Sequence, residues 1–285
     1  MAAFRFGGLI AGALVVGAAL LTSVPAASAV RCLPVTARDV QRIATVAPDV
    51  GPPAPGACGT LVLSGEIRPE DHAALLALLD RSGPYAAQLL TAATGGNTTD
   101  ALRIGQLVRE RMLATMAPLY RPDRATGVLP GACTPGQECA CAGACFLVWA
   151  AGIERHGDHV LLHQLPGGAD PTVRAHLADM EVPPAYADTI AALGPKAVLA
   201  VSAERLEADL KGPAPSLGAR VDAVCGTYDE AERIDRLALR AKGSRRTPAD
   251  GQRLALLEEK ITALDRCRAD TLTGERVRRR RTPIH

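Results

Sequence analysis

Aromatic residues are scarce in this sequence, which has three Phe, one Trp and four Tyr among 285 residues. A hydrophobic core must therefore be built mainly from Ala, Leu and Val, and the apolar fraction of 48% allows such a core. An excess of charge is also lacking, because the formal net charge is only +2. Composition alone thus gives no reason to expect nucleic acid or an acidic membrane surface as a partner.

Long apolar segments are missing as well, except at the N-terminus. There, an apolar run from Gly7 to Leu21 follows the single charge of Arg5 and precedes Ala27-Ser28-Ala29, the A-x-A form of a signal peptidase site. The run is short for a membrane span and no basic stop-transfer flank follows it, so we interpret residues 1–29 as a cleaved signal peptide. The alternative is an uncleaved membrane anchor. We expect an exported protein, periplasmic or secreted, with no membrane span after cleavage.

Cysteine, in contrast, is frequent after residue 29. The eight positions are Cys32, Cys58, Cys133, Cys139, Cys141, Cys145, Cys225 and Cys267. An even number of cysteines behind an export signal favours disulfides over free thiols. The central four have the spacing C-x5-C-x-C-x3-C, which does not match the paired CxxC pattern of structural zinc sites. We therefore expect disulfides, with no metal and no cofactor.

Strand and helix patterns alternate in the first half of the chain. Residues 60–67 are typical of a strand, and Pro69 opens a helix that continues to about Asp80. A second strand is predicted within residues 85–93, and a second helix follows the pair Gly95-Gly96. This βαβα order predicts an α/β fold with a parallel sheet covered by helices.

The flanking segments are less regular. Residues 30–58 are rich in Pro, Ala and Gly, and we expect an extended lead-in that a bond between Cys32 and Cys58 would hold.

After residue 115 the predicted order is a strand at 115–119, a polar insertion at 120–137, a buried helix at 146–151, a strand at 159–163, helices at 171–180 and 184–193, a strand at 197–201 and a helix at 203–210.

The C-terminal segment changes character. Apolar residues recur at helical spacing on both sides of a break near residue 246, which predicts an antiparallel helical hairpin over residues 216–272. Cys225 and Cys267 are equidistant from that break, so we expect them to be bonded. The arginine-rich tail, residues 273–285, has five arginines between positions 276 and 281. It could bind acidic surfaces, but we favour a solvated, disordered terminus.

Two features could carry chemistry. Gly95-Gly96 lies between an apolar strand and a helix N-terminus, where free backbone N–H groups can form an oxyanion hole. His163 ends an apolar strand beside a glycine-rich loop and could act as a general base. A lone histidine is more often structural, and glycine is common in turns between strands and helices.

Four segments together resemble the Clp protease proteolytic subunit. They are LVLSGEI, TAATGGNTTDALRIGQLVRE, CAGACFLVWAAG and HVLLHQLPGG, in the order and approximate spacing of that family. The likeness is to its exported relatives, which carry a Cys-Ala-Ser-Ala-Cys motif. It implies a Clp/crotonase-like domain over residues 59–215, built as a spiral of ββα units.

The resemblance assigns roles to individual residues. It places the oxyanion glycines at Gly95 and Gly96 and the catalytic histidine at His163. The position of the nucleophilic serine falls on Gly143, between Cys141 and Cys145, whose pairing follows the family's pattern. Cys133 and Cys139 would then close the insertion.

The orienting aspartate of the family should fall just before residue 201, where residues 196–200 contain no carboxylate. Because glycine has no atom that can attack a carbonyl, the resemblance implies a degenerate site without serine peptidase activity. We expect a binding or scaffold module whose partner is an unidentified protein or peptide. A homo-oligomer is possible, although the family's rings cannot be carried over to a chain with this insertion and hairpin.

Two rival hypotheses stay open at this point. The first is a hydrolase that uses Cys141 or Cys145 as nucleophile, or a water activated by His163 above the Gly95-Gly96 turn. The second is that the hairpin and the arginine-rich tail make the functional contact.

Overall fold

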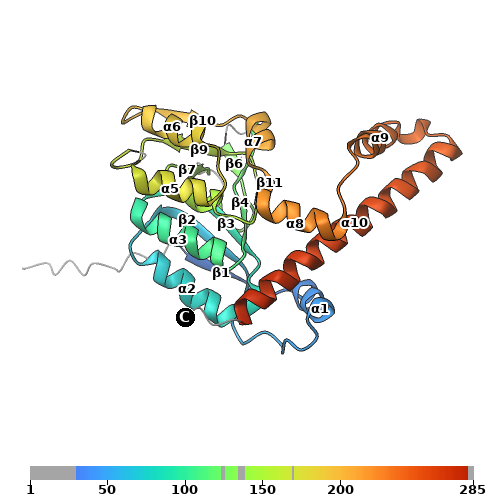
Figure 1. The fold of residues 1–285 in the computed structure, drawn as a ribbon, viewed down its shortest axis with the longest axis horizontal. Helices are drawn as coiled ribbons and strands as arrows, with labels where there is room; N and C mark the ends of the chain where they lie inside the picture. The colour runs from blue at the N-terminus through green and yellow to red at the C-terminus, as the bar shows by residue number, and fades with distance from the viewer. Residues whose placement is uncertain (1–29, 123–125, 134–138, 169, 282–285) are drawn as a thin grey trace, which may run out of the picture.

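The computed structural model describes residues 30–122, 126–133, 139–168 and 170–281. The segment interpreted as a signal peptide, residues 1–29, lies outside this part of the chain. The described residues form a mixed α/β protein from which a long C-terminal helix extends (Figure 1). The α/β class is therefore as the sequence predicted.

The larger sheet has six strands in the order β1-β2-β3-β4-β8-β11. Their bounds are Val30–Pro34, Cys58–Ile67, Gln88–Gly96, Ala114–Met116, Glu154–His156 and Gly212–Pro213. Strands β2, β3, β4 and β8 run parallel, whereas β1 and β11 pair antiparallel at the two edges. Helix α2 (Asp71–Ser82) connects β2 to β3, and α3 (Thr98–Glu110) connects β3 to β4. The predicted βαβα alternation is thus confirmed.

A second sheet of three strands has the order β10-β9-β7. It consists of β7 (Cys141–Ala142), β9 (Val160–His163) and β10 (Val198–Ala200), with β7 parallel and β10 antiparallel to β9. Helix α4 (Ala144–Ala150) contacts strands of both sheets, and all of its residues are buried. This is the buried helix that the sequence predicted.

The remaining small elements complete the body. They are α5 (Pro171–Asp179), α6 (Pro184–Ala192), α7 (Ala203–Asp209), the 3-10 turn η1 (Gly83–Tyr85) and the antiparallel pair β5 (Leu119–Arg121) and β6 (Thr126–Val128). The ring of Phe146 lies 6.1 Å from that of Trp149 and 5.8 Å from that of Tyr186, so three of the few aromatic residues meet in the core. The β5–β6 pair lies in the predicted insertion and was not expected.

The lead-in at residues 30–58, which we expected to be extended, contains a regular strand and a helix. Strand β1 pairs with β2, Val30 standing opposite Leu63, and α1 (Ala37–Val46) follows. The helix begins with a capping box in which the Thr36 side chain accepts from the Asp39 N–H and the Asp39 carboxylate accepts from the Thr36 N–H. A strand whose partner lies about thirty residues away leaves little local signal in a sequence.

The C-terminal hairpin has one more helix than predicted. Helix α8 (Pro215–Cys225) ends at Gly226, whose φ of 87° stops the helix, and α9 (Glu230–Ala241) follows as a separate segment. After the 3-10 turn η3 (Gly243–Arg245), α10 (Pro248–Arg281) returns to the body. Figure 1 shows α9 at the far end of α10, away from the sheets.

In its described part the arginine-rich tail is helical and only partly solvated, because Arg278 and Arg279 are exposed while other residues are buried. Helix α10 continues through it to Arg281, and the side chains of Arg276 and Val277 are only 7% and 3% exposed. They belong to a face of α10 that also buries Leu272 and Thr273. This buried face could not be predicted from the sequence, because a run of clustered arginines is usually solvated. Residues 282–285 lie outside the described part.

All eight cysteines are joined in disulfides. The pairs are Cys32–Cys58, Cys133–Cys139, Cys141–Cys145 and Cys225–Cys267, as predicted. Among the described residues, no helix combines the length and the apolar character that a membrane crossing requires. The disulfides fit a protein of an extracellular or periplasmic compartment.

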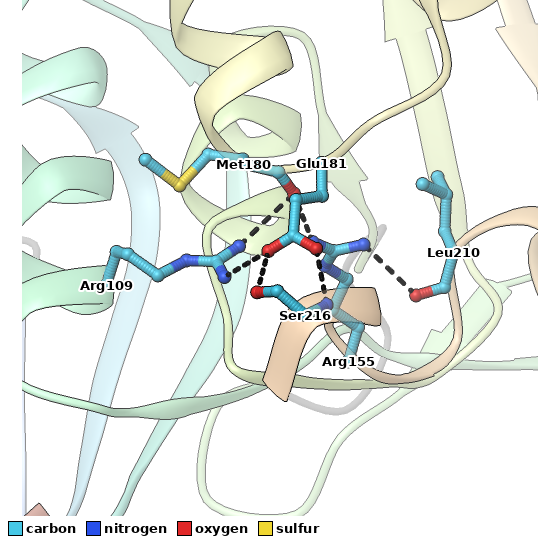
Figure 2. A network of polar contacts seen from close by, with 6 residues as sticks. All are labelled: Arg109, Arg155, Met180, Glu181, Leu210 and Ser216. Carbon is cyan, nitrogen blue, oxygen red and sulfur yellow. Dashed lines mark hydrogen bonds and ion pairs between the residues drawn. The ribbon is translucent and has the colours of Figure 1, made fainter. Parts of the chain in front are cut away.

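A polar network joins the body to the hairpin (Figure 2). Arg155 of β8 is 1% exposed and donates to the carbonyl oxygens of Met180 and Leu210. Arg109 of α3 also donates to the Met180 carbonyl and contacts Glu181 at 3.5 Å. The Glu181 carboxylate accepts from the Ser216 N–H at 2.7 Å and from its hydroxyl at 2.8 Å. The network therefore fixes the first turn of α8 to the α/β body.

The charges in this network shift its pKa values. Burial and, to a smaller extent, the charge of neighbouring Arg109 lower the pKa of Arg155 to about 10, while Glu181 acts in the opposite direction. For Glu181, partial burial acts to raise the pKa, but the hydrogen bonds from Ser216 and the charges of Arg109 and Arg155 outweigh it and hold the pKa below its ordinary value. The carboxylate is thus stabilised in its charged form.

We predict that Glu181→Gln lowers the free energy of unfolding by about 2 kcal/mol near neutral pH, because it weakens charge-assisted hydrogen bonds. The lowered pKa means that, in acid, the unfolded chain binds the proton before the folded chain does. The contribution is complete above the ordinary carboxyl pKa of 4.5 and is lost as the pH falls through the folded-state pKa.

Urea denaturation at about pH 7 and about pH 3 measures this difference, which should shrink at the lower pH. Glu110→Gln, at an exposed carboxylate ending α3, is the matched control and should change little at either pH. An equal loss for Glu181→Gln at both values would contradict a role for the charge.

Candidate functional site

The connection between β7 and α4 is a sharp turn at Gly143. This residue precedes the first residue of α4 and has φ 56° and ψ −120°. Its N–H donates to the Leu161 carbonyl at 3.0 Å, so β9 holds the turn in place. A residue with a side chain would be strained in this conformation, and such strain is found most often at functional sites.

His163 lies directly beside this turn. A Cβ atom placed on Gly143 would stand 3.6 Å from the Cβ and 3.8 Å from the Cγ of His163. The Nε2 atom of His163 is buried and has no hydrogen-bond partner in the described part of the chain. The structure therefore brings the predicted base position and the predicted nucleophile position into contact range, and one ring nitrogen of the histidine is left unused.

Gly95 completes the group. Its Cα lies 3.7 Å from the Cβ position of Gly143, and its own missing side chain would face the Ala142 carbonyl at 3.9 Å. Gly95 and Gly96 have φ values of 122° and 117°, but they end strand β3 instead of forming a separate turn. They stand opposite the last two residues of β2. Gly95 thus lines the site, while the missing side chain of Gly96 faces the backbone of Ile67.

No carboxylate of the described residues orients the histidine. Strand β10 places Val198 opposite His163, where the resemblance would require an acid nearby. In the described part of the chain, the His163 ring forms neither a hydrogen bond nor an ion pair, and Val198 is 55% exposed. A general base without an orienting acid is a weaker one, because nothing fixes its tautomer and ring position.

The disulfide Cys141–Cys145 spans the turn. It joins strand β7 to the first turn of α4, with Gly143 between its ends and a Cα–Cα distance of 5.3 Å. Both cysteines are fully buried. The bond removes Cys141 as a free thiolate nucleophile and also holds the strained turn closed. Within the described residues, no group of three His, Cys, Asp or Glu side chains could hold a metal ion.

One buried histidine, His176, was not predicted from the sequence. His176 of α5 donates from Nε2 to the Leu147 carbonyl of α4 at 3.1 Å and packs against Gly105 of α3. Burial lowers its pKa, so the ring is neutral at neutral pH. Its spacing from buried Val173 and Leu177 on α5 is the sequence signal that could have found it. It supports α4 and does not reach Gly143.

We predict that Gly96→Ala is far more destabilising than Gly95→Ala. Both changes strain a backbone with positive φ, but a Cβ at Gly96 would lie 2.3 Å from the Ile67 oxygen, whereas one at Gly95 meets nothing closer than 3.9 Å. Denaturant midpoints should show a cost above about 3 kcal/mol for Gly96→Ala and about 1–2 kcal/mol for Gly95→Ala. Equal costs would mean that β2 and β3 separate easily at their ends.

No protein-family model matches this chain, and no curated protein is significantly similar to it in sequence. The resemblance to the Clp protease proteolytic subunit therefore rests on the four sequence segments alone.

Proposed function

We propose that this chain is an exported relative of the Clp protease proteolytic subunit whose site binds a peptide segment without covalent catalysis. One observation carries this proposal: glycine occupies the strained turn between β7 and α4, beside His163, where the family has its serine. A serine–histidine mechanism needs a hydroxyl at that point.

The surroundings of the turn favour binding over chemistry. The Cys141 sulfur is engaged in a disulfide, and Val198 stands where a carboxylate would orient the histidine. A small apolar cluster lies nearby. It consists of Leu161, Ala140, which precedes β7, and Ala142, which belongs to β7. Exposed Val198 and Leu199 extend apolar surface along the edge strand β10. This chemistry suits an extended peptide with apolar side chains.

A second candidate function is hydrolysis by an activated water. The observation that favours it is the buried Nε2 atom of His163 without a partner. Because Gly143 has no side chain, a water can occupy the space that a serine hydroxyl would fill. The two functions differ in whether a bound peptide is cut.

We predict that the wild-type, non-reduced chain gains no mass from a fluorophosphonate or from a thiol-alkylating probe. Its four disulfides should leave it eight hydrogens below the mass of the reduced chain. Gly143→Ser should gain one fluorophosphonate adduct, because the new hydroxyl would lie beside the His163 ring.

The double variant Gly143→Ser/His163→Ala is the matched control and should lose this adduct. Intact mass spectrometry measures all three proteins. An adduct on the wild type would contradict the loss of the nucleophile, and an inert Gly143→Ser variant would contradict the assignment of this turn as the former catalytic centre.

We predict that Val198→Lys weakens binding of fluorescently labelled β-casein, an unfolded protein rich in apolar residues, by about tenfold. The change replaces an apolar contact worth about 1.5 kcal/mol with a charge. Leu256→Lys, at a 67% exposed position on α10, is the matched control and should leave binding unchanged. Fluorescence polarisation gives the affinity, and gel analysis reports cleavage.

Each result separates the hypotheses. A loss of binding with Leu256→Lys alone would move the functional contact to the hairpin. Cleavage of casein that disappears in His163→Ala would support the activated-water hydrolase instead. Deleting residues 216–285 would not be a clean test of the hairpin, because Leu217, Val221 and Leu272 pack against Met112 and Ile153 of the body.

A further inference from the structure

A cavity of about 240 Å³ lies at the opposite end of the sheet from Gly143. Its floor is made by the first residues of the parallel strands β2, β3, β4 and β8, and its walls by α1 and the end of α10. Figure 1 places α1 beside this end of α10. The volume is below the range of about 300–1,000 Å³ that drug-sized ligands need, so only a small molecule would fit.

Arg276 of α10 lines this cavity and is buried to 7% exposure. Its guanidinium donates to two neutral acceptors at long distances, the Pro84 carbonyl at 3.3 Å and the Thr273 hydroxyl at 3.5 Å. No carboxylate of the described chain lies within ion-pair distance of it. The negative charges of Glu154 and Asp39 act on Arg276 only from beyond that distance. A buried charge without a counter-ion in contact is costly, and proteins normally pair it.

A second guanidinium lines the same cavity. Arg42 of α1 is exposed and forms no hydrogen bond or ion pair in the described part of the chain. Burial, and next the positive charge of Arg42, lower the pKa of Arg276 to about 10, while the charges of Glu154 and Asp39 act in the opposite direction. Two like charges that face one small cavity are both stabilised by an anion between them, and a guanidinium fork matches a carboxylate in two hydrogen bonds.

Negative groups line the same cavity on the side of the sheet and of α1. Glu154, the first residue of β8, is half-buried, and in the described part of the chain its carboxylate forms no hydrogen bond or ion pair, although its charge acts on Arg276. Asp39 uses one carboxylate oxygen, Oδ2, in the capping box of α1. His156 also lines the cavity and is exposed. A doubly charged anion such as phosphate would be repelled by the two carboxylates, whereas an ammonium group would be attracted.

Apolar residues make up part of the remaining walls. Ala114, Ile153, Ala269 and Leu272 line the cavity together with the polar residues Thr60, Gln88 and Thr273. A ligand that matches the charged and the apolar walls carries a carboxylate, an ammonium group and a short aliphatic side chain. We propose that this cavity binds a free amino acid with an aliphatic side chain, its carboxylate at Arg276 and Arg42 and its ammonium at Glu154 and Asp39. The site is independent of the function proposed for the Gly143 turn.

Isothermal titration of the full, disulfide-bonded chain with L-leucine tests this proposal. Two matched probes each lack one charge: N-acetyl-L-leucine has no ammonium, and L-leucinamide has no carboxylate. We expect L-leucine to bind and both analogues to bind at least about tenfold more weakly, since each leaves one pair of side chains without its partner. Inorganic phosphate should not compete.

Variants at exposed or half-buried positions keep the test independent of folding. Arg42→Met should weaken L-leucine by at least about tenfold, whereas Arg38→Met should not, because Arg38 lies on the same helix but lines only the neighbouring groove. Glu154→Gln should weaken L-leucine and leave N-acetyl-L-leucine unchanged.

Three outcomes would overturn the proposal. They are the absence of L-leucine binding at millimolar concentration, equal affinity for L-leucine and N-acetyl-L-leucine, and unchanged affinity in Arg42→Met. Tighter binding of phosphate than of L-leucine would also overturn it, since the cavity would then be a site for inorganic oxyanions.

Discussion

The burial of one guanidinium, that of Arg155, is the constraint on which the layers of this protein depend. The residue lies on β8 within the sheet, and a charge in that position is tolerated only if acceptors surround it. Two of them, the carbonyl oxygens of Met180 and Leu210, belong to the residues that cap the C-termini of α5 and α7. Helix C-termini have unpaired carbonyl groups with partial negative charge. The guanidinium of the strand residue donates hydrogen bonds to these carbonyls, so its buried charge and the unpaired helix ends compensate each other. Through Glu181 the same cluster also fixes where α8 begins.

Periodicity in the sequence predicted the parts of the fold whose partners are close along the chain. The alternation from β2 to α3 and the buried helix α4 could be predicted, because each of these elements shows its own pattern of apolar residues in the sequence. Strand β1 could not, since its pairing with β2 depends on Leu63 and its neighbours. The end of α10 could not either, because Arg276 and Val277 are buried by α1 and the sheet and not by any neighbour in sequence.

The candidate site was predicted to a similar extent. Motif order brought out Gly95, Gly143 and His163, and the fold does place these three residues together. The strain at Gly143 and the position of Val198 opposite His163 depend on the pairing of β9 with its neighbours, which no local pattern reports. The cavity at Arg276 could not be predicted from local patterns either. Its charged residues come from α1, β8 and α10, which are distant in sequence.

The bond between Cys225 and Cys267 gives the protruding hairpin a covalent closure at its base. The connection Gly243–Arg245 is exposed and contains an arginine, so it is open to a trypsin-like protease. A cut there would leave two polypeptides that stay joined through sulfur, and the returning helix would still be anchored in the body by Arg276 and Val277. The chain can therefore be cleaved in this exposed connection while both fragments stay in one covalently linked molecule.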